Sequence, residues 1–105
     1  MSWVYLIFAG LLEIGWPLGL KIAQEPGKTF QGVLMAILFM AASGTLLFLA
    51  QRHIPIGTAY AVWTGLGAAG TFIVGVIVFG DPNSLMRYVG VALILAGAVT
   101  LKLAH

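Results

Sequence analysis

One acidic residue interrupts an otherwise apolar stretch near the start of the chain. Glu13 lies near the middle of the run from Trp3 to Leu20, which has no other charged residue. A charge at the centre of a membrane span costs at least about 2.5–3.5 kcal/mol, so such residues usually face a cavity and serve function. We predict that Glu13 binds a cation or a proton, because one carboxylate that accepts either is enough for exchange. The alternative is a neutral carboxyl that ties helices together.

The residues at helical spacing from Glu13 are candidates for the same site. Gly10, Trp16 and Pro17 lie three or four positions from Glu13, which places them on its helix face. Pro17 has no N–H group and cannot donate to the carbonyl of Glu13, so we expect a kink beside the carboxylate.

Two later apolar segments also carry polar and aromatic groups at helical spacing. Tyr60, Trp63 and Gly67 share one face of the third segment, and Met40 and Ser43 share a face of the second. Deep in a membrane, the O–H and N–H groups of Tyr and Trp need partners, as they would find near a carboxylate. Alternatively, Tyr60 and Trp63 are aromatic residues that lie at the membrane interface and serve packing. Ser43 could likewise bond a carbonyl of its own helix rather than a ligand.

The remaining sequence excludes several kinds of chemistry. The chain has no cysteine, and it shows no nucleophile–base pair, phosphate-binding loop or metal-binding cluster. We therefore expect no catalytic residues, no cofactor and no metal site, and hence no enzyme. The net charge of +2 is small and its basic residues are scattered, which argues against nucleic acid as a partner.

The composition places these residues in a membrane. Of the 105 residues, 61% are hydrophobic and 8% are charged, whereas soluble domains have about 25% charged residues. We predict an all-α integral membrane protein with the lipid bilayer as its surroundings and no cleaved signal peptide. It forms one domain, 1–105, with four transmembrane helices at about 2–22, 30–50, 55–79 and 84–104.

The third segment and the turn after it have distinctive features. Residues 54–80 are 27 residues without a charge, about 40 Å as a straight helix, so this segment should tilt, kink or extend past the bilayer. A kink is favoured by the glycines at 65, 67, 70 and 75. In the turn from Asp81 to Ser84, we expect the Asp and Asn oxygens to cap the last helix.

The positive charges are almost equally divided between the two sides of the membrane. Four spans place Lys21, Lys28 and Arg87 on one side, and Arg52, Lys102 and the terminal amine on the other. Because a Lys/Arg bias normally sets orientation, this near-tie predicts that the chain inserts both ways round. The alternative is that a small protein simply has few charges.

Three stretches resemble a known family. They are Ala9–Trp16 (AGLLEIGW), Pro55–Gly67 (PIGTAYAVWTGLG) and Gly90–Gly97 (GVALILAG). In order and spacing, the chain resembles the small multidrug resistance family over essentially its whole length. Trp16, the triplet Trp63-Thr64-Gly65 and Lys102 resemble the guanidinium-exporting branch more than the quaternary-ammonium branch.

The resemblance implies an assembly and a mechanism. It implies an antiparallel homodimer in the bacterial inner membrane, with two copies of Glu13 in one site and export driven by inward proton movement. By position, it implies a site wall of Trp16, Ser43, Tyr60 and Trp63, a hinge at Gly65 and Gly67, and a dimer contact at Gly90, Leu93 and Gly97.

These observations lead to one functional hypothesis and its rivals. We predict a proton-coupled antiporter that exports guanidinium and small substituted guanidinium cations, because guanidinium N–H pairs match carboxylates. The alternative substrate class is quaternary ammonium or aromatic cations, with the aromatic residues as cation–π walls. Pro17 occupies a position at which the guanidinium-exporting branch mostly has a small residue. Because Pro17 lies next to the site, it affects which of the two substrate classes the site would accept. A passive cation channel and a non-transporting assembly partner are the rivals of other classes.

Overall fold

The computed structural model describes residues 1–104, and its regular structure there is entirely helical. The helices are α1 (Ser2–Leu12), α2 (Gly15–Ala23), α3 (Thr29–Ala50), α4 (Ile56–Phe79) and α5 (Leu85–Ala104). Helices α1 and α2 together form one span, so four segments are long and apolar enough to cross a membrane: Ser2–Ala23, Thr29–Ala50, Ile56–Phe79 and Leu85–Ala104. The predicted all-α chain with four spans is confirmed.

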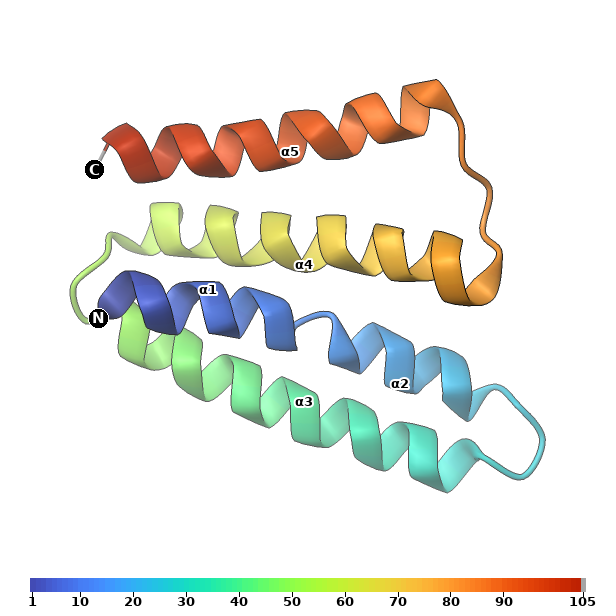
Figure 1. Ribbon diagram of the computed structural model, residues 1–105. Helices are drawn as coiled ribbons and strands as arrows, with labels where there is room; N and C mark the ends of the chain where they lie inside the picture. The colour runs from blue at the N-terminus through green and yellow to red at the C-terminus, as the bar shows by residue number, and fades with distance from the viewer. Residues whose placement is uncertain (105) are drawn as a thin grey trace.

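The first span is interrupted at its carboxylate. The N–H of Ile14 bonds the carbonyl of Leu11, three residues back, at 3.2 Å, and α2 begins at Gly15. Pro17 lies four residues after Glu13 and has no N–H to continue the helical ladder. The expected local distortion is therefore present, as a break between two helices (Figure 1).

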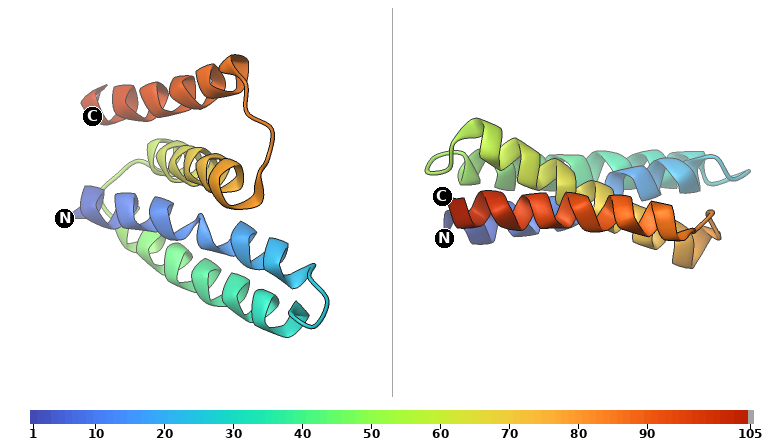
Figure 2. Two further views of the ribbon diagram at one scale, coloured as in Figure 1. Left: turned by 45° about the vertical axis from the view of Figure 1, so that its right-hand side comes forward. Right: turned by 90° about the horizontal axis from the view of Figure 1, so that it is seen from above.

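The helices lie side by side in a flat arrangement. Helix α3 lies against α1 and α2, α1 lies against α4, and α4 lies against α5 (Figures 1 and 2). The Cα atoms extend 45 × 34 × 17 Å, so the molecule is thin in one direction. The start of α1 and the end of α5 lie on the side of the α3–α4 connection, opposite the other two connections (Figure 1). With the connections arranged in this way, the two sides carry almost equal numbers of positive charges, as counted from the sequence.

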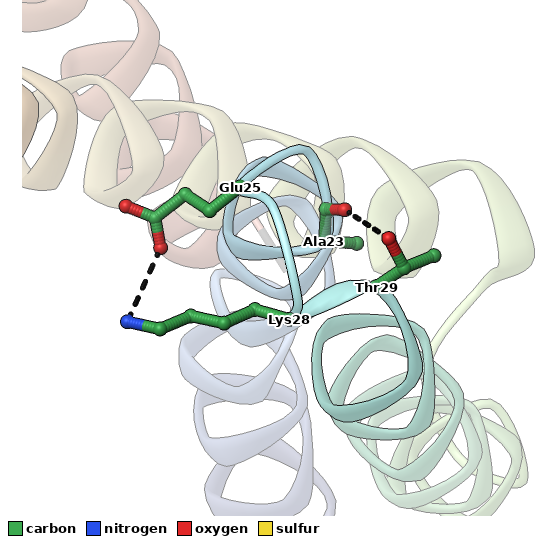
Figure 3. Close-up of polar contacts among 4 residues, drawn as sticks. All are labelled: Ala23, Glu25, Lys28 and Thr29. Carbon is green, nitrogen blue, oxygen red and sulfur yellow. Dashed lines mark hydrogen bonds and ion pairs between the residues drawn. The ribbon is translucent and has the colours of Figure 1, made fainter.

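Small residues bring α2 and α3 into close contact. A Cβ atom on Gly19 would lie 2.7 Å from the backbone oxygen of Gly32, and one on Gly32 would meet the backbone of Ala23. Glycines of this kind let membrane helices approach closely. At their connection, the Thr29 hydroxyl at the start of α3 donates to the carbonyl of Ala23 at the end of α2 at 3.0 Å, and the connection itself contains an exposed ion pair between Lys28 and Glu25 at 3.5 Å (Figure 3).

The region after the second span differs from the prediction in two ways. Helix α4 continues without interruption from Ile56 to Phe79, so the chain break lies in the first span and not in the third. At the start of α5, the hydroxyl of Ser84 accepts the Arg87 N–H at 3.3 Å. Ser84, and not Asp81 or Asn83, therefore supplies the capping oxygen.

Candidate functional site

Glu13 faces a cavity between the first span and α4. The cavity has a volume of about 390 Å³, and α1, α2, α4 and the α4–α5 connection supply its walls, namely Glu13, Pro17, Thr64, Gly67, Ala68, Thr71, Phe72 and Asp81. The Oε1 atom of Glu13 is buried and has no hydrogen-bond partner among residues 1–104. A buried carboxylate oxygen without a partner is costly to keep, which makes this cavity a candidate site for a cation or a proton.

A glycine on α4 makes room for the carboxylate. A Cβ atom on Gly67 would overlap the Cγ of Glu13 and lie 3.0 Å from its Cβ. One turn away, a Cβ on Gly10 would lie 2.7 Å from the Leu66 side chain. Gly10 and Gly67 therefore let α1 and α4 approach each other at the level of Glu13.

Ser43 and Trp63 fix the backbone next to Glu13. The Ser43 hydroxyl donates to the carbonyl of Ala9 at 2.7 Å, and the indole N–H of Trp63 donates to the Ser43 oxygen at 2.8 Å. The same Ala9 carbonyl accepts the backbone N–H of Glu13 at 2.9 Å. Ser43 thus bonds a neighbouring helix rather than its own, and three helices are joined by hydrogen bonds one turn before the carboxylate.

Trp16 and Met40 line a different cavity in the single chain. This second space, about 420 Å³ between α2 and α3, is lined by Trp16, Leu20, Ala36, Ile37, Met40 and Ala41. The helical spacing placed Trp16 on the face of Glu13, but Pro17 lines the carboxylate's cavity and Trp16 does not. Positions i+3 and i+4 of a helix lie on opposite flanks of residue i, about 100° apart, so a cavity on one flank of Glu13 is lined by Pro17 and not by Trp16. The Trp16 Nε1 atom is buried without a partner in the part of the chain that is described.

The other predicted positions lie at helix surfaces and contacts. Tyr60 is exposed, and its ring centroid is 5.6 Å from that of Trp63. Gly65, proposed as part of a hinge, lies against α5, where its Cβ would be 3.1 Å from Ile94. On α5, a Cβ on Gly90 or Gly97 would meet no atom within 4 Å, and Leu93 is 68% exposed.

The sequence reasoning missed four polar or aromatic residues that line the Glu13 cavity. They are Thr64, Thr71, Phe72 and Asp81. The spacing of Thr64, Gly67 and Thr71 at i, i+3 and i+7 is a signal that would have found the two threonines. Nothing in the local sequence indicates that Asp81 reaches the same cavity, because that depends on how the chain turns after α4.

Comparison with known proteins gives a consistent result over nearly the whole length. The family model described as Small Multidrug Resistance protein matches residues 1–94. The guanidinium exporter of Yersinia pseudotuberculosis is 46% identical over 104 residues, which cover 99% of each chain. The guanidinium exporters of Escherichia coli K12 and Proteus vulgaris are 43% and 42% identical over 97–99% of each chain. These names describe exporters rather than enzymes.

Four membrane-spanning segments, with Glu13 lining a cavity between the first span and α4, define a small multi-pass membrane protein. The chain belongs to the small multidrug resistance family, because the family model covers most of it and full-length relatives exceed 40% identity. The family resemblance found in the sequence is confirmed.

Proposed function

We propose that this protein is a proton-coupled antiporter that exports guanidinium and small substituted guanidinium cations across a bacterial inner membrane. Glu13 carries the proposal, because it lines a cavity of about 390 Å³ and its Oε1 atom is buried without a hydrogen-bond partner among residues 1–104. Ligand pockets have volumes of roughly 300–1,000 Å³. The names of the bacterial relatives support guanidinium as the substrate.

The mechanism follows from competition for one charge. A guanidinium ion presents pairs of N–H donors that match the two oxygens of a carboxylate. A proton on Glu13 removes the negative charge that holds the cation, so proton binding releases the cation and proton loss prepares the next binding. The cation and the proton both need the Glu13 carboxylate, and this competition couples their movement in opposite directions. Gly10, Ser43 and Trp63 support the backbone and space beside it.

A second copy of the chain completes the site in this proposal. The Cα atoms of the single chain extend only 17 Å in one direction, and α5 has no buried residue, so one chain is too flat to surround a pathway. We infer an antiparallel homodimer whose site contains two Glu13 carboxylates, with Gly90, Leu93 and Gly97 at the contact between α5 helices and Gly65 and Gly67 as the hinge. Inverted repeats with a site at the midplane are common in transporters.

Dual insertion supplies the two orientations. Four spans would place Lys21, Lys28 and Arg87 on one side of the membrane and Arg52, Lys102 and the terminal amine on the other, so the Lys/Arg count favours neither orientation. Two extra lysines in the Glu25–Lys28 connection should fix one orientation and reduce export, and an oppositely biased copy should restore it. Normal export by a population with one orientation would exclude the antiparallel arrangement.

The proposal is tested by transport into proteoliposomes with an imposed pH gradient. The unmodified protein should accumulate guanidinium against its own gradient, which a passive channel cannot do. Glu13→Gln should abolish this accumulation, whereas Glu25→Gln, which removes an exposed charge paired with Lys28, should leave it unchanged. Uphill accumulation retained by Glu13→Gln would overturn the mechanism.

Larger cations remain the second candidate substrates because of one observation. The apolar cavity of about 420 Å³ beside Trp16 and Met40 has room for an alkyl group next to an aromatic wall. We expect guanidinium to be transported faster than tetramethylammonium, which has no N–H group for Glu13. Pro17→Ala should increase that preference by restoring the helical wall. A faster rate for tetramethylammonium would overturn the guanidinium assignment and leave the antiporter in place.

A further inference from the structure

A second carboxylate lines the cavity that contains Glu13. Asp81, in the α4–α5 connection, borders the 390 Å³ cavity and also an adjoining cavity of about 170 Å³. Pro17 and Thr71 border both spaces as well, so the two cavities meet at these residues. Lys21 lines only the second cavity. Together the cavities extend from Glu13 toward the membrane surface on the side of the α4–α5 connection.

The fold of the connection brings Asp81 back onto α4. Gly80 has a φ of 68°, a left-handed conformation that favours glycine, and the N–H of Asp81 then bonds the Gly75 carbonyl at 3.0 Å. A Cβ atom on Gly75 would overlap Oδ2 of Asp81. The carboxylate therefore lies against the side of α4 that faces the cavity, in a space that a larger residue at position 75 would fill.

The charge of Asp81 is free to bind a cation. Asp81 is exposed, and within residues 1–104 it forms no ion pair and does not cap α5, which Ser84 does. The basic residue that lines the second cavity with Asp81 is Lys21, and its ammonium nitrogen lies 6.0 Å from the centre of the Phe79 ring.

Polar groups lie between the two carboxylates. Gly67 faces Glu13 and Gly75 faces Asp81, so the two positions are eight residues apart on α4, or about 12 Å along its axis. Thr71 lies midway between them and lines both cavities. Because the carboxylates lie beside positions about 12 Å apart along α4, we treat them as two successive positions for a small cation.

We propose that Asp81 forms an outer binding site that captures the guanidinium-type cation at the mouth of the cavity before it moves to Glu13. The inference rests on the proposed export function and adds a residue to it. A negative charge at a cavity mouth raises the local concentration of cations and so increases their rate of capture. In the antiparallel dimer, each membrane surface would have one Asp81.

The experiment compares Asp81→Asn with the unmodified protein and with Glu25→Gln in proteoliposomes at low salt. Glu25 is a matched control because it is an acidic residue on the same membrane side that lines neither cavity and pairs with Lys28 (Figure 3). Asp81→Asn should raise the KM for guanidinium about fivefold and leave kcat within about twofold. At high salt the KM difference should shrink, because exposed charges are screened. Glu25→Gln should match the unmodified protein.

Gly75→Ala gives a second, independent test. It keeps the Asp81 charge but moves the carboxylate away from α4, so KM should rise as in Asp81→Asn, whereas Gly44→Ala, in open space on α3, should have no effect. A KM of Asp81→Asn equal to that of the unmodified protein would overturn the outer site, as would a fall in kcat with an unchanged KM. If the unmodified protein itself shows no proton-driven uptake, the proposed export function fails instead.

Discussion

Spaced glycines occur both at the contact between α2 and α3 and on the outer face of α5. Only at the α2–α3 contact do these glycines lie against another helix of the same chain. Gly19 and Gly32 are buried, and an added Cβ on either would meet the backbone of the opposite helix. Gly90 and Gly97 are exposed, and an added Cβ on either would meet nothing. The same small residue type thus marks a completed contact in one place and an open surface in the other.

This difference shows which parts of the fold one chain can complete. The first three spans are joined by backbone contacts and by the hydrogen bonds of Ser43, which is fully buried. Helix α5 lies along α4, and no residue of α5 is buried. Small residues on a membrane helix serve close packing, so the open glycines of α5 support the proposed contact with a second copy.

The largest effect is expected where a side chain would be forced into the α2–α3 contact. Gly32→Val would place atoms against the backbone of Ala23 and Gly19, which cannot move aside as a flexible side chain can. We expect a loss of about 3 kcal/mol in the free energy of unfolding, the upper part of the usual range for overpacking. Unfolding in detergent, followed by circular dichroism, measures this loss.

Gly44→Val is the matched control on the same helix. An added Cβ on Gly44 would meet no atom within 4 Å, so its effect on stability should stay within about 0.5 kcal/mol. Equal losses for the two variants would show that α3 is sensitive to valine itself and not to the contact with α2.

The spans and the break beside Glu13 were predictable from sequence because their causes are local. Apolar runs of about 20 residues determine the spans, and Pro17 removes a hydrogen bond four residues back whatever surrounds it. The expected kink of α4 rested on its glycines, and sequence alone cannot tell a flexible glycine from one in a contact. In the structure, Gly65 faces α5 and Gly67 faces Glu13.

The composition of the Glu13 cavity depends on contacts that no local pattern encodes. Trp16 lies outside the cavity because positions i+3 and i+4 flank Glu13 on opposite sides, and the spacing does not tell which flank faces the cavity. Asp81 reaches the cavity because Gly80 reverses the chain onto Gly75. Its sequence neighbours indicated only a turn and a cap, since the direction of the turn is set by tertiary packing.

A smaller effect is expected from removing a hydroxyl inside the completed part of the fold. Ser43→Ala would leave the Trp63 N–H without its partner, and an unsatisfied buried donor costs about 1–3 kcal/mol. Thr45→Ala, which removes an exposed hydroxyl bonded to its own helix at Ala41, should change stability by less than about 0.5 kcal/mol. Unfolding curves of both variants test this difference, and equal curves would mean that the three-helix network adds no stability.

The smallest effect on the fold, with a clear effect on assembly, is expected on the outer face of α5. Leucine at both Gly90 and Gly97 would enter open space in the single chain, so the helical content and unfolding of the monomer should be unchanged. In the proposed dimer, the added side chains would separate two α5 helices that small residues let approach. We expect self-association, measured by energy transfer between labelled copies in liposomes, to weaken about tenfold, equivalent to about 1.4 kcal/mol.

Ala92→Leu distinguishes loss of a specific contact from a general effect of bulk on α5. Ala92 is exposed on the same helix, but at helical spacing it lies on a different face from Gly90 and Gly97. It should leave energy transfer and guanidinium uptake unchanged, whereas the double leucine variant should lose both together, since the proposed site needs Glu13 from two copies. Undiminished association of the double variant would place the dimer contact elsewhere, and the open glycines of α5 would then face lipid.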